Sequence, residues 1–223
     1  MRSTLALVFA ALSAPAFAAD ASHPAVIELF QSQGCSSCPP ANAALAQYAD
    51  RADWLALTFA VTYWDRLGWK DTFAQPAFTE RQYAYARLGG TYTPEVVVNG
   101  RAAGVGAEVS EVEGLARRAE RSAAGPEVRI EGGDVAIGAG AAPSGGADVW
   151  LALYDPRTLE VAIPRGENAG RTLGHRNVVK RLVRLGSWNG EAVKLPLPSS
   201  EGLARAVLVQ TRGVGPILAA ARG

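Results

Sequence analysis

The sequence is poor in the residues on which disulfide frameworks and metal sites depend. Its 223 residues include only two cysteines, two histidines and one methionine. Two cysteines cannot build the set of long-range disulfides that stabilises many small secreted proteins. Since Cys35 and Cys38 lie three positions apart, the only thiol chemistry open to the chain is that of a local dithiol.

Charge of one sign and long hydrophobic runs are also missing. Lysine and arginine number 22 against 21 aspartates and glutamates, and the net charge is +1. This balance lacks the electrostatic footprint of a general nucleic-acid or membrane-surface binder, so we expect no nucleic acid among the partners. No segment approaches the ~20 apolar residues that cross a bilayer. We therefore expect no membrane insertion of the mature chain.

The amino-terminal segment has the order of a bacterial export signal. Arg2 precedes an apolar stretch from Leu5 to Leu12, and the small-residue sequence Ala-Phe-Ala ends at Ala18. This order predicts a signal peptide over residues 1–18 and a periplasmic or secreted protein. Disulfides persist in that compartment, so the two cysteines are expected to be paired at rest.

The pattern of secondary structure changes near residue 124. Before that point, strands are expected at Ala25–Phe30, Trp54–Val61, Glu95–Val98 and Arg101–Val105, and helices at Ala41–Tyr48, Thr79–Leu88 and Glu108–Ser122. This order of elements is that of a thioredoxin-type sheet. After that point, we expect strands separated by glycine-rich turns, at Val149–Tyr154, Leu159–Ile163, Val178–Leu185, Ala192–Leu197 and Ala206–Thr211.

These patterns predict an α/β thioredoxin-like domain over residues 19–124, followed by a mostly-β, sandwich-like domain over residues 125–223. One strand assignment is ambiguous, because the apolar residues of Val178–Leu185 fit helical spacing as well. A chain of this length has room for two domains, each with its own core.

The dithiol sequence Cys35-Ser36-Ser37-Cys38 follows the first predicted strand and precedes the first predicted helix. Free N–H groups and the helix dipole stabilise a thiolate at such a position. We therefore expect Cys35 to be the more exposed and more acidic thiol and to act as the attacking group. Cys38, one turn further in, would resolve the mixed disulfide.

Other uses of a Cys-x-x-Cys pair remain open. The pair can form an inert disulfide, whereas a zinc site would need two further ligands and only His23 and His175 are available. Two soft thiolates can bind copper(I), although no methionine cluster accompanies them. We expect no metal and no organic cofactor, and keep a non-catalytic module that binds copper(I) or a protein partner as the alternative.

Four motifs stand out along the chain: SQGCSSCPP from Ser32, YWDRLGWKD from Tyr63, YTP from Tyr92 and GENAGRTL from Gly166. Together they resemble a family of secreted bacterial thioredoxin-like proteins of unknown function. The resemblance covers both halves of the mature chain. It implies a thioredoxin-like fold with an appended β domain, and it brings no established substrate.

The same resemblance assigns roles to three residues. In such folds a cis proline stands opposite the dithiol, and the residue before it pairs with an extended substrate; this implies a cis bond between Thr93 and Pro94. Glu28, seven positions before Cys35, resembles the buried acid of thioredoxins with one residue of misfit, and would move a proton. The alternative for Glu28 is pairing with an arginine or exposure to solvent.

Two further segments are candidates for substrate binding. Trp64 and Trp69 lie in an unusually aromatic loop and either pack in the core or form an apolar platform beside the dithiol. The polar loop Arg165–Arg171 lacks the spacing and the lysine of a phosphate loop. We expect it to find hydrogen-bond partners at the dithiol face through Asn168, with a plain turn as the alternative.

The sequence therefore predicts a periplasmic or secreted thiol–disulfide oxidoreductase. Cys35, Cys38, Thr93, Pro94 and Glu28 are the predicted catalytic residues. Its expected partners are protein or peptide thiols and disulfides, together with an unidentified redox partner. The direction of the reaction does not follow from the sequence, because it depends on the reduction potential.

Overall fold

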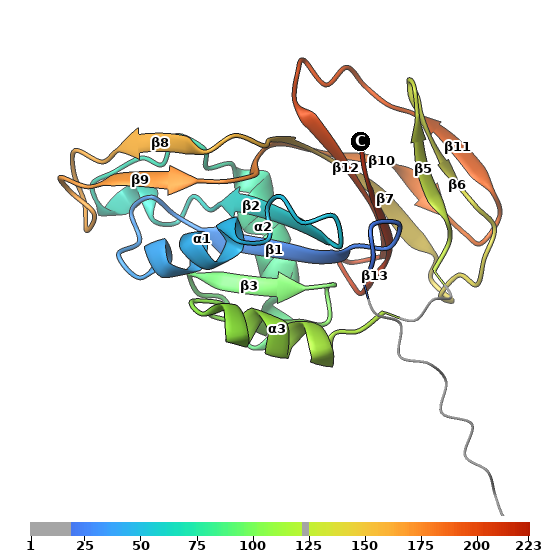
Figure 1. Cartoon of the computed structure of the whole chain (residues 1–223), viewed down its shortest axis with the longest axis horizontal. Helices are drawn as coiled ribbons and strands as arrows, with labels where there is room; N and C mark the ends of the chain where they lie inside the picture. Colours follow the sequence, from blue (N-terminus) through green and yellow to red (C-terminus); the bar gives the residue numbers. More distant parts are fainter. Residues whose placement is uncertain (1–18, 122–124) are drawn as a thin grey trace, which may run out of the picture.

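An eight-stranded mixed sheet runs through the molecule in the computed structural model, which describes residues 19–121 and 125–223 (Figure 1). The strand order is β13-β12-β7-β10-β2-β1-β3-β4. The predicted signal peptide and its cleavage site lie outside the described residues, and so does Ala124 at the predicted domain boundary.

The elements predicted before residue 124 are present, with ends that differ by a few residues. In chain order they are β1 (Ala25–Gln31), α1 (Cys38–Ala46), β2 (Trp54–Ala60), α2 (Pro76–Ala84), β3 (Glu95–Val98), β4 (Ala102–Gly104) and α3 (Val109–Arg118). Two short 3-10 helices, η1 (Asp65–Leu67) and η2 (Ala86–Leu88), lie on either side of α2.

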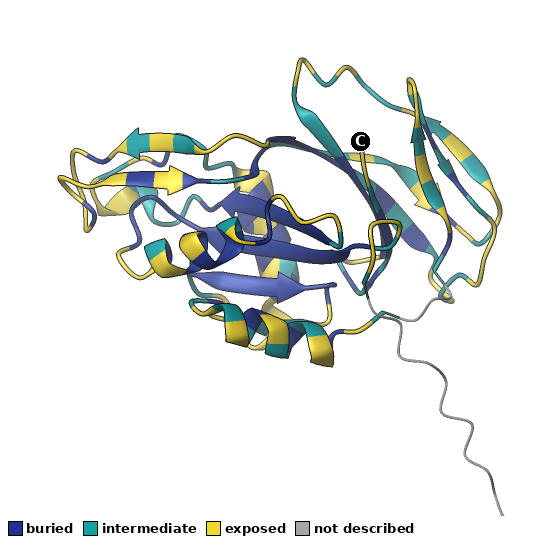
Figure 2. Cartoon of the chain, in the orientation of Figure 1, coloured by how far each residue is buried: buried dark blue, intermediate teal, exposed yellow. Residues whose placement is uncertain are grey.

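Helices cover both faces of the sheet at β1. Successive side chains of a strand point to opposite faces, so Val26 and Phe30 join a core cluster with Phe78 of α2. Ile27 and Leu29 point the other way and pack against residues of α1 and α3. Because both faces are covered, every residue of β1 and β2 is buried, and Figure 2 shows these strands dark blue at the centre. This explains their nearly continuous apolar sequences.

The sheet continues into the second half of the chain. Four strands extend it beyond β2: β7 (Ala147–Asp155), β10 (Val178–Trp188), β12 (Ala204–Thr211) and β13 (Ile217–Arg222). The junction is one parallel pairing, between Val178 and Thr58. The Thr58 N–H donates to Asn177 O at 3.0 Å, and Asn177 Nδ2 donates to Ala56 O at 2.8 Å.

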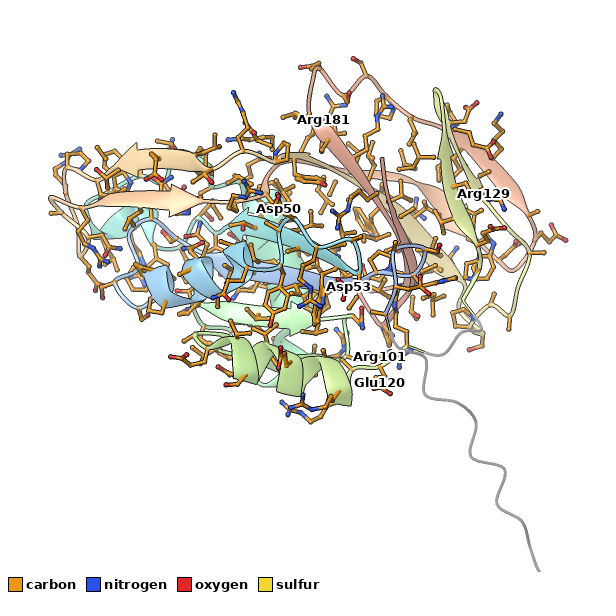
Figure 3. The ribbon with its side chains drawn as sticks, in the orientation of Figure 1. Asp50, Asp53, Arg101, Glu120, Arg129 and Arg181 are labelled. Atoms are coloured by element: carbon orange, nitrogen blue, oxygen red, sulfur yellow. A yellow bond between two sulfur atoms is a disulfide. The ribbon has the colours of Figure 1, made fainter. Side chains whose placement is uncertain are left out.

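A second, smaller sheet packs on these added strands. It consists of β5 (Val128–Glu131), β6 (Asp134–Ile137) and β11 (Val193–Pro196), in the order β11-β6-β5. Val135 and Ile137 meet Val149, Trp188 and Val207 in a common core. Figure 3 shows Arg129 of β5 in this smaller sheet, which lies at the opposite end of the molecule from the β8–β9 hairpin described next.

The last element is a hairpin of β8 (Leu159–Ala162) and β9 (Thr172–His175). It leaves the large sheet between β7 and β10 and runs alongside α1, at the left end of the view in Figure 1. A polar loop over residues 163–171 joins its two strands.

The predicted fold class is wrong. The structure is mostly β, with three α-helices among the described residues, and it contains no separate thioredoxin-type sheet followed by a separate sandwich. β7, β10, β12 and β13 belong to the same sheet as β1–β4, and most of their pairings are antiparallel. The local pattern does not contain this information, because it depends on one contact between segments far apart in sequence.

The ambiguous segment after residue 178 is a strand, not a helix. The division into domains at residue 124 stays a prediction. No helix in the described parts of the chain is long and apolar enough to cross a membrane.

Candidate functional site

Cys35 and Cys38 form a disulfide where α1 begins, with their Cα atoms 5.5 Å apart. Pro39 and Pro40 occupy the next positions, where the N–H groups that proline lacks would have no partner within the helix. Both cysteines are buried, with exposed fractions of 0% and 1%. The expectation that Cys35 is the more exposed thiol concerns the reduced protein and stays a prediction.

The loop between β8 and β9 covers the disulfide segment. Asn168 is fully buried, and its Nδ2 donates to Gln33 O and to Cys35 O, each at 2.9 Å. Arg171 Nη1 donates to Asn168 Oδ1 at 2.8 Å, which fixes the orientation of the amide. The expected placement of this loop at the dithiol face is confirmed, and the role of Asn168 in substrate binding stays a prediction.

Glu167 adds a second contact from the same loop. Its Oε2 accepts hydrogen bonds from Ser36 N at 3.1 Å and from Ser36 Oγ at 2.7 Å. Hydrogen bonding to the Ser36 hydroxyl and N–H lowers the pKa of Glu167. Ser36 and Glu167 are both exposed, so this contact lies at the solvent-facing edge of the loop that covers the disulfide segment.

Gln33 connects the disulfide segment to the aromatic loop. Its Oε1 accepts from Trp69 Nε1 at 2.9 Å, its Nε2 donates to Thr72 Oγ1 at 3.0 Å, and its N–H donates to Asp71 Oδ2 at 2.7 Å. Burial raises the pKa of Asp71 to about 6. Gln33 was not predicted as a site residue, although it lies inside one of the quoted motifs, whereas Asp71 was expected to frame the aromatic loop or to pair on the surface.

Trp69 thus has a positioning contact. Its indole N–H holds Gln33, two residues before Cys35, and the residue is partly buried. Whether it also contacts a substrate stays a prediction.

Thr93 and Pro94 lie on the other side of the disulfide segment, and the bond between them is cis, as predicted. Ser37 Oγ lies 3.3 Å from Cys35 Sγ and donates to Thr93 O at 3.4 Å. Trp64 Nε1 donates to Thr93 Oγ1 at 2.7 Å, and Trp64 packs partly against the core. The structure therefore brings Thr93 and Trp64 to the disulfide, and their roles in binding a substrate stay predictions.

Glu28 does not face α1. It alternates with Ile27 and Leu29 along β1 and so points to the opposite face from the helix that carries Cys38. Its carboxylate is fully buried and pairs with Arg81 Nε at 2.5 Å, while Tyr85 OH donates to it at 2.5 Å. Glu28 was expected either to move a proton below the dithiol or to pair with an arginine or face solvent. Its contacts agree with pairing to an arginine.

Glu95 is a buried acid that the sequence analysis did not select. It directly follows Pro94 and is fully buried, and Gln82 Nε2 donates to its Oε2 at 2.8 Å. Burial, with a smaller contribution from the negative charge of Glu28, raises its pKa to about 7. Its signal in the sequence was an acidic residue next to three valines in a predicted strand.

His175 on β9 is also fully buried, and neither ring nitrogen has a hydrogen-bond partner in the structure. Burial lowers its pKa to about 4. Its ring meets Phe73 edge to face at 5.7 Å. Within residues 19–121 and 125–223, no group of three or more His, Cys, Asp and Glu side chains could hold a metal ion.

One hollow of the surface lies away from the disulfide. It measures about 290 Å³ and lies at the amino ends of β1 and β2, whereas the disulfide follows the carboxyl end of β1. Asp53 and Glu120, labelled in Figure 3, are among its lining residues, and none of the predicted site residues is.

Comparison with known proteins places the chain in a family. The model of a protein family of unknown function, DUF1223, matches residues 26–210, which include both cysteines and the loop that covers them. The chain belongs to the DUF1223 family. No curated protein matches it.

Two solved structures resemble this DUF1223 protein. The crystal structure of protein AGR_C_4864 from Agrobacterium tumefaciens has a TM-score of 0.73 and 33% sequence identity, over 89% of this chain and 92% of that one. HBP35 of Porphyromonas gingivalis has a TM-score of 0.59 and 13% identity, over 91% of this chain and 75% of that one. At that identity the second likeness concerns the fold alone.

Proposed function

We propose that this DUF1223 protein catalyses thiol–disulfide exchange through Cys35 and Cys38 in the periplasm or outside the cell. The observation that carries the proposal is the disulfide itself, at the start of α1 and in contact with two other segments, those of Thr93 and of Asn168. An inert disulfide does not need such surroundings. A redox pair does, because its neighbours set the energies of its thiolates.

The reaction begins when a substrate thiolate attacks Cys35 Sγ. A mixed disulfide forms between the substrate and Cys35, and the bond to Cys38 breaks, so that Cys38 leaves as a thiolate and takes a proton from solvent. A second substrate thiolate then attacks the mixed disulfide, releases the Cys35 thiolate and completes a substrate disulfide. The substrate loses two electrons and two protons, and the protein gains them. The reverse sequence reduces a substrate disulfide.

The surrounding residues support these steps in different ways. Thr93 offers backbone groups beside Ser37, and Trp64 fixes the Thr93 hydroxyl. The carbonyl oxygen of Cys35 is bound by Asn168, which holds the first cysteine in place. Because both cysteines are buried, the Arg165–Arg171 loop must move aside before a substrate reaches Cys35.

The proposal is tested by trapping the mixed disulfide. Reduced Cys38→Ser protein is mixed with a model peptide disulfide, and the products are resolved by mass spectrometry after acid quenching. We expect one peptide attached at Cys35, because the resolving thiol is gone. Reduced Cys35→Ser protein is the matched control and should trap several-fold less. If the folded Cys38→Ser variant formed no adduct, the proposal would be contradicted and the disulfide would have a structural role.

The copper(I)-binding alternative is tested on the reduced wild-type protein, which keeps both thiols. Retention of one copper(I) per chain against a competing chelator, without any disulfide exchange, would favour binding over catalysis.

A further inference from the structure

The negatively charged carboxylate of Glu167 contacts the segment that joins the two cysteines. Its carboxylate accepts hydrogen bonds from both donors of Ser36. The Ser36 nitrogen is bonded to the carbonyl carbon of Cys35, so the charge lies next to the first cysteine. The residue comes from the β8–β9 hairpin, more than one hundred residues further along the chain.

Other charged groups lie on the elements around this segment, and each has a contact of its own. Asp71 accepts from Gln33 N, and Arg171 donates to Asn168. Glu95, after Pro94, accepts from Gln82. α1 has no acidic residue in its first turn and no basic residue in its last turn. Of these charged groups, Glu167 is therefore the one that binds Ser36 directly.

We propose that Glu167 is a positioning residue for the exchange reaction: it holds the Arg165–Arg171 loop over the disulfide and disfavours the Cys35 thiolate while the loop is closed. This inference rests on the proposed function. A dithiol reductant gives two electrons and two protons to the disulfide, and the reductant itself becomes a disulfide. When the Cys35 thiol then loses its proton, its new negative charge and the charge of Glu167, which is bound to the next residue, repel each other. The repulsion breaks the Glu167 contact and loosens the loop over Cys35.

The geometry gives the loop two contacts of different kinds. Asn168 binds carbonyl oxygens through a neutral amide, and this bond does not depend on the redox state of Cys35. The Glu167 carboxylate is charged and exposed, so its hold on Ser36 responds to a new charge nearby. Reduction and ionisation of Cys35 therefore weaken the contact between Glu167 and Ser36. The hydrogen bonds of the buried Asn168 amide then remain to hold the loop.

The first test measures the acidity of Cys35. In a Cys38→Ser background, the rate of alkylation by iodoacetamide is followed across pH. Glu167→Gln keeps an oxygen that can accept from Ser36 and removes the charge, so we expect the pKa of Cys35 to fall by about half a unit to one unit. Glu160→Gln, an exposed change on the same hairpin, is the control and should leave this pKa unchanged. An unchanged or higher pKa in Glu167→Gln would overturn the proposal.

The second test follows the Ser36 amide in the intact protein by hydrogen exchange. Reduction at a pH above the Cys35 pKa should accelerate exchange of this amide about tenfold in the wild type. The acceleration should be several-fold smaller in Glu167→Gln, in which the repulsion is absent. Equal acceleration in both proteins would overturn the proposal.

Neither test requires a substrate, so the two proposals fail separately. A lower Cys35 pKa in Glu167→Gln, in a protein that exchanges with no peptide, would uphold this inference and contradict the proposed function. Active exchange with peptides, together with an unchanged Cys35 pKa in Glu167→Gln, would uphold the proposed function and contradict this inference.

Discussion

The side-chain amide of Asn168 donates a hydrogen bond of 2.9 Å to the carbonyl oxygen of Cys35. The two residues belong to different halves of the chain, and the bond brings the β8–β9 loop onto the segment that leads into α1. The same amide also binds Gln33 O. The second half of the chain therefore contributes directly to the surroundings of the disulfide.

Asn168→Ala tests this contact. It removes both hydrogen bonds, so Gln33 O loses this donor and Cys35 O keeps only the N–H of Cys38, at 3.2 Å. We therefore expect the free energy of unfolding to fall by about 1–3 kcal/mol. We also expect reduction by dithiothreitol to become several-fold faster, because the loop no longer covers the disulfide. Asn189→Ala, at an exposed position, is the control. A reduction rate equal to that of the wild type would show that the loop does not limit access.

The ion pair between Arg81 and Glu28 predicts a large loss of stability. Both side chains are almost completely buried, so Arg81→Met leaves the Glu28 carboxylate without its counter-charge. We expect the free energy of unfolding to fall by about 3–5 kcal/mol in urea denaturation. The exposed pair of Arg129 and Glu127 gives the matched control, since Arg129→Met should cost at most about 1 kcal/mol. Similar losses in both variants would contradict this account.

Glu95 predicts that stability falls as pH rises toward neutrality. Its pKa in the folded protein is about 7, above its ordinary value of 4.5. Between these values the folded state binds more protons than the unfolded state, so stability decreases with increasing pH. Glu95→Gln should remove a decrease of roughly 1–3 kcal/mol between pH 4.5 and pH 7, measured by urea denaturation. Parallel pH profiles for the two proteins would contradict the raised pKa.

Burial of His175 leads us to expect that the stability of the protein decreases as the pH falls below neutrality. Its pKa in the folded protein is about 4, below its ordinary value of 6.5, because burial disfavours the charged ring. The unfolded state therefore binds more protons in this range, and stability is lost as pH falls from 6.5 through 4. His175→Phe retains an aromatic ring against Phe73 and should unfold at lower pH than the wild type. His23→Phe, at a partly exposed position, should not change the acid transition.

Local patterns were sufficient to predict much of the first half of the chain. Continuous apolar sequences gave β1 and β2, and the Asn99-Gly100 turn gave the β3–β4 hairpin. These signals act within a few residues, so they can be read from the sequence. The position of the dithiol between a strand and a helix followed from the same signals.

The fold class could not be predicted in this way. Periodicity shows which face of a strand is buried, and it does not show which strand pairs with which edge. The edge of β2 is covered by β10 through Val178 and Thr58, and the turn before β10 uses Asn177 to bind Ala56 O. Such a contact has no local signal, so the two halves looked independent when they share one sheet.

The candidate site shows the same limit. Asn168 was selected because a polar loop needs partners when it is buried, and this reasoning gave its location correctly. Gln33 and Glu95 were missed because their importance comes from burial, which depends on packing by distant segments. For Glu28, the sequence could not show that Arg81 and Tyr85 lie on the opposite face of β1 from α1.

The reduction potential of Cys35–Cys38 tests the central claim most directly. The intact protein is equilibrated with glutathione redox buffers, quenched with acid and alkylated, and the reduced fraction is measured by mass spectrometry. An exchange enzyme should be half reduced at a potential above about −300 mV, the range in which redox-active disulfides lie. A disulfide that remains oxidised at all potentials down to about −300 mV is a structural one, and this result would contradict thiol–disulfide exchange as the function.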